Sequence, residues 1–279
     1  FARQVRRMEE LPEIAVNRVP VEPFATFPAR WREAAQAEFD FVFLSHVFFN
    51  SGHALPDLVD TVQAVRSPEA LIAIDGYHAV CALPVSLRGV ESRIFYLGGG
   101  YKYAQAGEGI CFLAVPPGTK WRPINTGWFA AYGALESKQS GGVVPYDESG
   151  MRFAGATMDL SGAYRFNAVQ KWWDEIGLTV DKIHQRVERL KQIFVGEISK
   201  AGLKRLNPDA ILRSNGQLPQ GHFVVFQTPE AVTLMNELRK RRIIVDARGD
   251  RLRFGFGLYH DTQTITDLSE RVQSLFGIL

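Results

Sequence analysis

The feature of this 279-residue sequence that most limits its fold is a repeated alternation of apolar and amphipathic segments in its first 116 residues. The apolar runs are continuous, as in strands buried on both faces, and the segments between them have helical periodicity. We expect strands over 13–19, 39–49, 70–76, 92–99 and 109–116 and helices over 27–38 and 55–65. A mostly parallel sheet covered by helices on both faces satisfies this pattern. The first half of the chain is therefore predicted to be an α/β layered domain.

The second half has a different pattern, in which two long helices precede a short α+β unit. A helix over 163–177 should end at Gly177, where a left-handed turn costs glycine little. A second helix over 181–202 places five apolar residues on one face, namely Ile183, Val187, Leu190, Phe194 and Ile198. Strands over 222–228 and 243–257 and helices over 228–242 and 262–276 complete the unit. We expect a large α/β domain over residues 1–160, with an irregular excursion over 115–150, and a small α+β domain with its connecting helix over 161–279.

Composition excludes several classes of protein. The net charge is only +2, from 32 basic and 30 acidic side chains, and no long Lys/Arg run suggests a nucleic-acid groove. No stretch reaches the roughly 18 apolar residues of a membrane helix, and the first residues lack the apolar core of a signal peptide. Cys81 and Cys111, both expected in strands, cannot form a disulfide framework or a metal site. We expect a cytoplasmic protein without metal, nucleic-acid or membrane partners and, because it starts at Phe1 on a basic helix-like segment, a piece of a longer chain.

Polar residues follow three of the predicted strands at the point where each strand ends. The first strand, in LSHVFFNSG, has Ser45 and His46 within it and residues 50–52, Asn-Ser-Gly, at its end. Asp75 ends the run LIAID with His78 three residues later, and Tyr101 and Lys102 follow the glycines at 98–100. Ligands of open α/β sheets bind at the carboxyl ends of strands. An acid, an imidazole, a phenol and an amine are therefore expected in one cleft.

Taken singly, these residues have plainer interpretations. Asp75 could cap a turn before Gly76, His78 could be a hydrogen-bonded structural histidine, and Lys102 could be a surface lysine. The glycines around Lys102 favour a close approach that a solvated lysine would not need, and we expect them to make room for a flat cofactor. Neither a P-loop nor a dinucleotide fingerprint fits their spacing.

A desolvated lysine can form an imine with a carbonyl compound, as lysines do with pyridoxal phosphate. That cofactor also needs an acidic partner for its pyridine nitrogen, because the protonated ring acts as the electron sink. Lys102 and Asp75 are residues of these two types.

Several segments of this sequence together resemble the fold-type I, class V aminotransferase superfamily of pyridoxal-phosphate enzymes, and within it most closely the kynureninases. They are LSHVFFNSG, IDGYHAV, YKYAQAGEG, TGWF, AGAT, VDAR and LRFGFGLY, and the resemblance covers essentially the whole chain. It implies a large domain with a mostly parallel sheet and a smaller C-terminal α+β domain. It also implies that the ring-stacking aromatic residue and the phosphate-binding turn of the family precede the point where this sequence starts.

The resemblance implies a role for each candidate residue. Lys102 is implied to be the Schiff-base lysine, Asp75 the partner of the pyridine nitrogen, and His78 a neighbour of the ring. Tyr101 matches a tyrosine that contacts the cofactor phosphate and shuttles protons. Arg253, in LRFG, matches the arginine that pairs with the α-carboxylate of the substrate.

Two further residues imply shared active sites. Trp128, in TGWF, matches a tryptophan that reaches the phosphate from the neighbouring subunit, and Thr157 is similar to a threonine that does so in other class V members. A homodimer acting on a small amino-acid substrate is therefore expected. Where kynureninases have an asparagine before two prolines, this chain has residues 156–158, Ala-Thr-Met.

The expected reaction is kynureninase-like hydrolytic cleavage of a Cβ–Cγ bond. The alternative is a class V aminotransferase, which uses the same residues to pass an amino group to a keto acid. A second alternative is a truncated, non-catalytic relic that keeps the scaffold as a binding partner. Desulfurase chemistry is disfavoured, because Tyr101 replaces the histidine that precedes the lysine in desulfurases and both cysteines are expected in strands.

Overall fold

The larger sheet has four strands in the order β1 (Phe41–Ser45), β2 (Leu71–Asp75), β3 (Ile94–Gly99) and β4 (Cys111–Ala114). The structure is a computed structural model that describes residues 2–136 and 141–277. Strands β1, β2 and β3 are parallel, with Ser45 opposite Asp75 and Asp75 opposite Leu97. The carboxyl ends of these strands therefore meet at one edge, as the sequence pattern predicts.

Apolar packing holds this sheet and its helices together. Ile72 and Ile74 of β2 are fully buried, and the cluster around them includes residues of α2 (Phe27–Ala34) and α3 (Leu58–Gln63). The Trp31 indole donates a hydrogen bond to the Thr61 carbonyl at 2.8 Å, which ties α2 to α3. The other short elements at this end of the chain are α1 (Ala2–Glu9) and a 3-10 turn (Phe24–Thr26).

Three details differ from the sequence-based expectations. Residues 13–19, predicted as a strand, are irregular. Strand β4 is antiparallel to β3 and all its residues are exposed, so it is an edge strand and not a buried one. Cys81 lies in a turn with a positive φ of 61°, so its predicted place in a strand is wrong.

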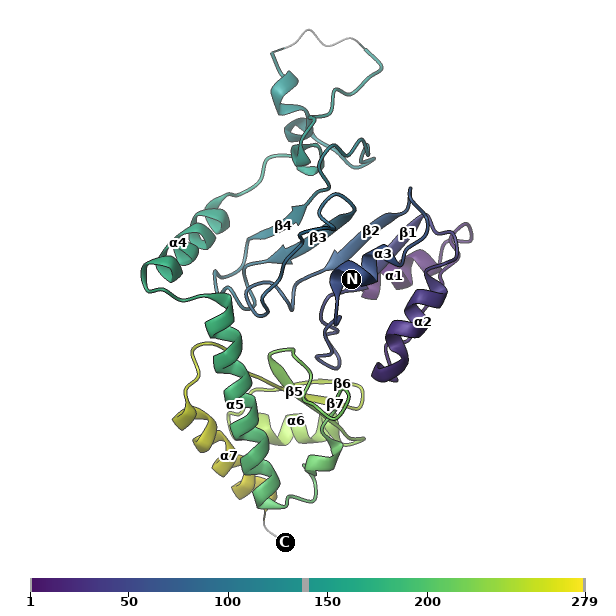
Figure 1. Cartoon of the computed structure of the whole chain (residues 1–279). Coiled ribbons are helices and arrows are strands. Elements are labelled where there is room, and N and C mark those ends of the chain that lie inside the picture. Colours follow the sequence, from purple (N-terminus) through teal and green to yellow (C-terminus); the bar gives the residue numbers. More distant parts are fainter. Residues whose placement is uncertain (1, 137–140, 278–279) are drawn as a thin grey trace.

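The segment between β4 and α4 (Ser161–Glu175) is irregular, as predicted, apart from 3-10 turns at Trp128–Ala134 and Gly150–Phe153. Figure 1 shows it projecting from the sheet on the side away from the C-terminal unit. Residues 137–140 of this excursion lie outside the described residues. Helix α4 then returns along the sheet. Gly177, which follows α4 in the chain, has the predicted left-handed conformation, with φ of 62°.

The C-terminal unit is built on α5 (Val180–Ala201) and a three-stranded antiparallel sheet in the order β5-β7-β6. Its other elements are a 3-10 turn (Pro208–Ala210), β5 (Phe223–Gln227), α6 (Ala231–Lys240), β6 (Asp246–Arg248), β7 (Arg251–Gly255) and α7 (Thr262–Phe276). All five apolar residues predicted to share a face of α5 are buried, which confirms that prediction. Because β5, β7 and β6 lie below the larger sheet in Figure 1, β7 can contribute to a site between the two sheets.

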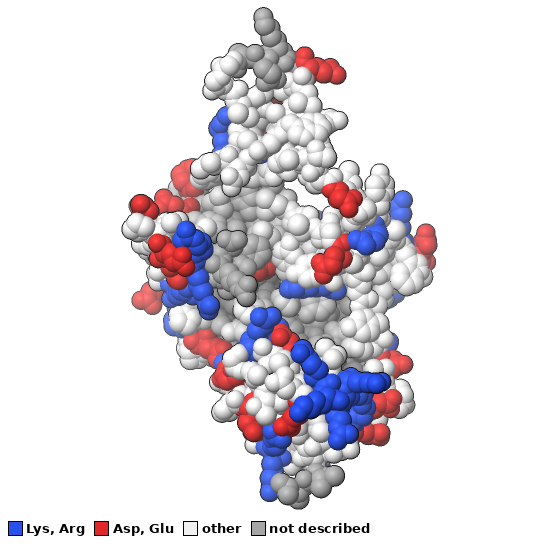
Figure 2. Space-filling model, turned by 180° about the vertical axis from the view of Figure 1, so that it is seen from behind, with Lys and Arg blue, Asp and Glu red and all other residues white. Residues whose placement is uncertain are grey.

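Charged side chains of both signs are spread over the surface. Figure 2 shows Lys and Arg gathered mainly over the C-terminal unit and acidic residues interspersed elsewhere. Within the described ranges, none of the helices combines the length and the apolarity that crossing a bilayer requires.

Candidate active site

Asp75 ends β2 and is held by its own backbone surroundings. Its Oδ1 accepts a hydrogen bond from the Tyr77 N–H at 3.0 Å, and its carbonyl accepts one from the His46 N–H at 2.8 Å. A Cβ on Gly76 would lie 2.3 Å from the ring of Tyr96, so only glycine fits there. This close packing fixes the turn that presents the carboxylate.

Lys102 follows β3 in the loop that the glycines begin. Its Nζ lies 5.6 Å from the ring centroid of Tyr77 and 5.7 Å from that of Tyr101, which is within cation–π range. Burial lowers the pKa of Lys102, the nearby Asp75 carboxylate opposes this shift, and the Arg253 guanidinium adds to it. The structure thus brings Lys102 into electrostatic contact with both Asp75 and Arg253, and it favours the free amine more than water does.

The glycines around Lys102 do allow a close approach, but the groups that approach belong to this chain. A Cβ on Gly98 would meet Phe112 at 2.4 Å, and one on Gly99 would meet Tyr77 at 2.6 Å. A Cβ on Gly100 would lie 2.6 Å from Ile110. On the side where a Cβ would lie, these three glycines therefore make room for side chains of this chain.

His78 lies between the two sheets. Its Nδ1 is 3.4 Å from the hydroxyl of Tyr103, and its ring is 5.6 Å from that of Phe223 on β5. Burial, together with the charges of Lys102 and Arg253, lowers the pKa of His78 to about 3. The imidazole is consequently neutral at physiological pH.

Arg253 joins this cluster from β7 of the C-terminal unit. Its guanidinium lies over Phe223, 5.3 Å from the ring centroid, and donates hydrogen bonds to the Phe49 carbonyl and to the Asp246 carboxylate. The side chain is only 13% exposed. His78 and Phe223 thus link the end of β2 to the strand pair that carries Arg253, and the charge of Arg253 acts on both His78 and Lys102.

The two units also meet directly beside this cluster. The Gly221 N–H donates to the Gly52 carbonyl at 2.8 Å, and the imidazole of His53 is 3.0 Å from the Ser214 hydroxyl. Lys191 of α5, which is fully buried, donates to the carbonyls of Pro219 and Gly221 at 2.6 and 3.0 Å. These contacts set the position of β5 and therefore of Phe223.

Tyr101 lies at the mouth of the cluster, and Trp128 and Thr157 lie elsewhere. Tyr101 is 42% exposed, with its ring 5.7 Å from that of Tyr77. The Trp128 indole donates to the Thr157 hydroxyl at 3.0 Å, and Trp128 is 46% exposed. Since Trp128 lies in the excursion of Figure 1, away from the C-terminal unit, the structure pairs these two residues with each other and not with Lys102.

Sequence reasoning missed three residues of the cluster. Tyr77 contacts Lys102, Tyr103 contacts His78, and Asp246 pairs with Arg253. All three lie inside segments already singled out, namely IDGYHAV, YKYAQAGEG and VDAR. Each is a direct neighbour of a candidate residue, in the chain or across the β6–β7 pair.

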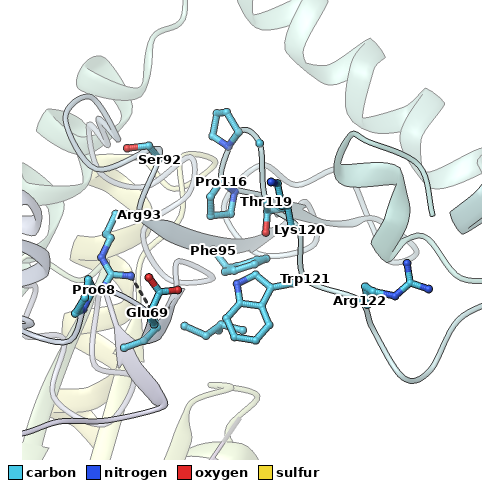
Figure 3. A pocket seen from close by; sticks show the side chains of 14 residues that line it. Pro68, Glu69, Ser92, Arg93, Phe95, Pro116, Thr119, Lys120, Trp121 and Arg122 are labelled. Atoms are coloured by element: carbon cyan, nitrogen blue, oxygen red, sulfur yellow. Dashed lines mark hydrogen bonds between the residues drawn. The ribbon is translucent and has the colours of Figure 1, made fainter. Parts of the chain in front are cut away.

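A separate cavity of about 620 Å³ lies at the opposite edge of the larger sheet. Figure 3 shows Arg93 and Phe95 lining it together with Trp121. Arg93 is occupied by the Ala70 carbonyl at 2.6 Å and by that of Ser67, so its charge holds a turn. Glu69 and Lys120 also line this cavity, which lies at the amino ends of β2 and β3 and therefore away from Asp75 and Lys102.

Of the two cysteines, Cys111 contacts the cluster, because its thiol and the Tyr77 hydroxyl are hydrogen-bonded, whereas Cys81 lies in a turn. Burial raises the pKa of the Cys81 thiol to about 11, which makes it a poor nucleophile at neutral pH, and Cys111 is exposed at the start of β4. Within the described part of the chain there is no group of three His, Cys, Asp or Glu side chains that could hold a metal ion.

Comparison with solved structures shows a shared fold. The chain superposes on a cysteine desulfurase from Thermococcus onnurineus with a TM-score of 0.70 and 14% identity, over 89% of this chain and 62% of the desulfurase. For a C-DES protein with glycine covalently linked to its PLP cofactor, the TM-score is 0.67 and the sequence identity is 18%. The match covers 88% of this chain and 63% of that protein. For serine palmitoyltransferase from S. paucimobilis, with bound PLP and myriocin, the TM-score is 0.56 and the sequence identity is 15%. The match covers 89% of this chain and 58% of the transferase. The chain therefore spans less than two thirds of each of these proteins.

No curated protein gives a significant match. The sequence model of the class V aminotransferases, a family whose cofactor is pyridoxal phosphate, matches residues 10–260. That range covers most of the chain, and the α/β architecture with a parallel-dominant sheet agrees with it. The chain is a member of the class V aminotransferase family.

Proposed function

We propose that this protein is a pyridoxal-phosphate enzyme that transforms an amino acid, with Lys102 as the residue that binds the cofactor covalently. The observation that carries the proposal is the position of the Lys102 amine, which lies against the rings of Tyr77 and Tyr101 at the carboxyl edge of β2 and β3, where the charges of Asp75 and Arg253 both act on it. An idle scaffold has no physical need to keep a desolvated amine between a carboxylate and a guanidinium. This disfavours the non-catalytic relic.

The residues of the cleft fit the cofactor chemically. The Asp75 carboxylate, with one oxygen held by the Tyr77 N–H, would bind the protonated pyridine nitrogen. The neutral His78 would lie near the ring without opposing its charge. When bound, the cofactor supplies an electron sink for a carbanion at the substrate α-carbon.

The protein's own groups would position the substrate and move its protons. Arg253 would bind the α-carboxylate, and the Lys102 amine would remove the proton from Cα, since burial leaves a larger share of that amine unprotonated. Tyr101, exposed at the mouth of the cleft, would contact the phosphate and exchange protons with the reacting group.

We favour kynureninase-like hydrolysis of a Cβ–Cγ bond, because the YKYAQAGEG and VDAR segments are most similar to those of kynureninases. Transamination uses the same residues and is the second candidate. Borohydride reduction followed by peptide mapping tests the common step: we expect a cofactor adduct on Lys102 that Lys102→Ala abolishes, and no adduct at saturating cofactor would refute the enzyme proposal. Incubation with kynurenine, with cysteine, and with amino-donor and keto-acid pairs then separates the reactions by product: alanine plus an aromatic acid, sulfide, or a new amino acid.

We also propose a homodimer in which Trp128 and Thr157 serve the site of the neighbouring subunit. Both residues lie on the excursion, and Trp128 is exposed there. Mixing Trp128→Ala with Lys102→Ala protein should then restore activity, since about a quarter of the sites in randomised dimers would contain neither change. Activity that stays at the level of the separate variants would contradict the shared site.

A further inference from the structure

The partner of Arg253 in this structure is a carboxylate of the same chain. Asp246 on β6 lies directly opposite Arg253 on β7, and its Oδ2 accepts a hydrogen bond from Arg253 Nη2. The same Oδ2 accepts one from Arg248 Nε at 3.2 Å. The Arg253 side chain is 13% exposed, Asp246 is 42% exposed and Arg248 is 61% exposed. Asp246 is therefore shared between a guanidinium in the cleft and one at the surface.

The rest of the Arg253 guanidinium is also partly engaged. Nη1 donates to the Phe49 carbonyl, so both terminal nitrogens already contact acceptors of this chain. Nε is buried and has no hydrogen-bond partner among the described residues. A ligand carboxylate that binds in the usual two-pronged manner must share or displace one of these acceptors.

We propose that Asp246 competes with the substrate carboxylate for Arg253 and shifts to Arg248 when the substrate binds, so that Asp246 sets the affinity of the site for carboxylates. This inference rests on the proposed function, which assigns the substrate carboxylate to Arg253. Of the two acceptors, Asp246 is the one that moves, because it has a second cation within reach and its side chain is partly exposed. The Phe49 carbonyl is fixed in the backbone.

The physical basis is repulsion between two carboxylates at one guanidinium. Asp246 compensates the charge of Arg253, so an incoming anion meets a weaker field than a free guanidinium would provide. Asparagine at this position keeps an oxygen that accepts the same hydrogen bond and removes only the charge. Asp246→Asn should therefore bind carboxylates more tightly, by about tenfold at low ionic strength, with a smaller gain as salt screens the charges.

The experiment is calorimetric titration of the cofactor-loaded protein with 3-phenylpropionate, an amine-free carboxylate that cannot react, and with its neutral amide. The variants are Asp246→Asn, Arg248→Gln and Arg253→Gln. Asp60→Asn is the matched control, because Asp60 on α3 is similarly exposed and forms an ion pair with Arg32 of α2 at 2.7 Å. Titration of the cofactor-free protein gives a second readout that does not depend on turnover, and circular dichroism checks that each variant is folded.

We expect Asp246→Asn to bind the carboxylate about tenfold more tightly and the amide unchanged. Arg248→Gln should weaken carboxylate binding, because Asp246 then has only Arg253 to pair with, and Asp60→Asn should have no effect. The inference is overturned if Asp246→Asn binds the carboxylate no more tightly than the wild type does, while Arg253→Gln no longer binds it. In that case Asp246 only orients Arg253. If Arg253→Gln leaves the preference for carboxylate over amide intact, the assignment of Arg253 in the proposed function fails as well.

Discussion

Acidification from pH 7.5 to 5.0 is expected to destabilise this protein strongly, because two histidines are buried in the neutral form. His46 is 8% exposed and His222 is 1% exposed. Burial lowers the pKa of His46 to about 4. Burial, with further contributions from His184 and Lys191, lowers the pKa of His222 to about 3. Neither imidazole can take up a proton at pH 5 while the protein stays folded.

The sign and size follow from proton linkage. In the unfolded chain both histidines titrate near 6.5, so below that pH the unfolded state binds more protons than the folded state. Their stabilising contribution is complete above pH 6.5 and is lost as the pH falls toward 4 and then 3. At pH 5.0, which is about 1.5 pH units below 6.5, each histidine lowers the free energy of unfolding by about 2 kcal/mol. His46 and His222 together contribute about 4 kcal/mol, and His78, whose pKa burial lowers to about 3, adds about 2 kcal/mol by the same linkage. The total is a large part of a typical domain stability of about 5–15 kcal/mol.

Urea unfolding of the cofactor-free protein at pH 7.5, 6.5, 5.5 and 5.0 measures this loss. In His46→Gln the glutamine can still hydrogen-bond to Tyr96, whose hydroxyl lies 2.9 Å from His46 Nδ1, but it cannot titrate. The variant should therefore lose about 2 kcal/mol less than the wild type across this pH range. His260→Gln is the control, because His260 is only partly buried and its pKa is less strongly lowered. The reasoning would be refuted if the free energy of unfolding changed by less than about 1 kcal/mol between pH 7.5 and 5.0. It would also be refuted if the free energy of unfolding of His46→Gln depended on pH as steeply as that of the wild type.

Three further outcomes are expected. Lys191→Met should lower the free energy of unfolding, measured in urea at pH 7.5, by about 2–4 kcal/mol, because the buried carbonyls that Lys191 binds lose their donor. A decrease of less than about 1 kcal/mol would contradict this. Gly76→Ala should lower stability by about 1–3 kcal/mol, since its Cβ would overlap the buried ring of Tyr96, and a thermal midpoint equal to the wild type would argue against that packing. Iodoacetamide at pH 7.5 should alkylate the exposed Cys111 well before Cys81, whose pKa burial raises to about 11; peptide mapping of a time course would show the reverse order if Cys81 were accessible.

The parts of the fold that follow from periodicity were predictable. The apolar face of α5 and the last helix lie where the pattern predicts, because their packing depends on residues close in sequence. The antiparallel direction of β4 was also within reach, because only nine residues separate the strands predicted over 92–99 and 109–116, and a parallel connection needs a crossover of about a dozen residues or more. Residues 13–19 have a strand-like pattern but pair with none of the strands that the structure describes, and a strand requires a partner for its backbone groups.

The site was predictable to the extent that local rules place residues at strand ends. Asp75 and Lys102 follow neighbouring parallel strands, so their proximity needs only the order of the strands. The pairing of Asp246 with Arg253 was also within reach, because a two-residue turn at Gly249 and Asp250 puts them opposite each other. The Trp128–Thr157 hydrogen bond joins two irregular segments 29 residues apart, and no periodicity connects them.

The contacts of α4 bear on where the two domains divide. Gly162 of α4 has no room for a Cβ, which would lie 2.5 Å from the Gly109 carbonyl, and Arg165 donates a hydrogen bond to the Glu108 carbonyl. The helix thus packs on the loop that carries Lys102. The main apolar cluster of the C-terminal unit, by contrast, runs from Val187 to Val272.

We therefore propose that the small domain begins after Gly177 and not after residue 160, and that residues 178–279 fold on their own. A fragment of 178–279 and one of 161–279 should unfold cooperatively at the same urea midpoint, because α4 adds no core contacts to the C-terminal cluster. In the longer fragment, α4 should exchange its amide protons rapidly, since its packing surface on residues 108–109 is missing. A folded 161–279 fragment beside an unfolded 178–279 fragment would instead assign α4 to the small domain and support the boundary at residue 160.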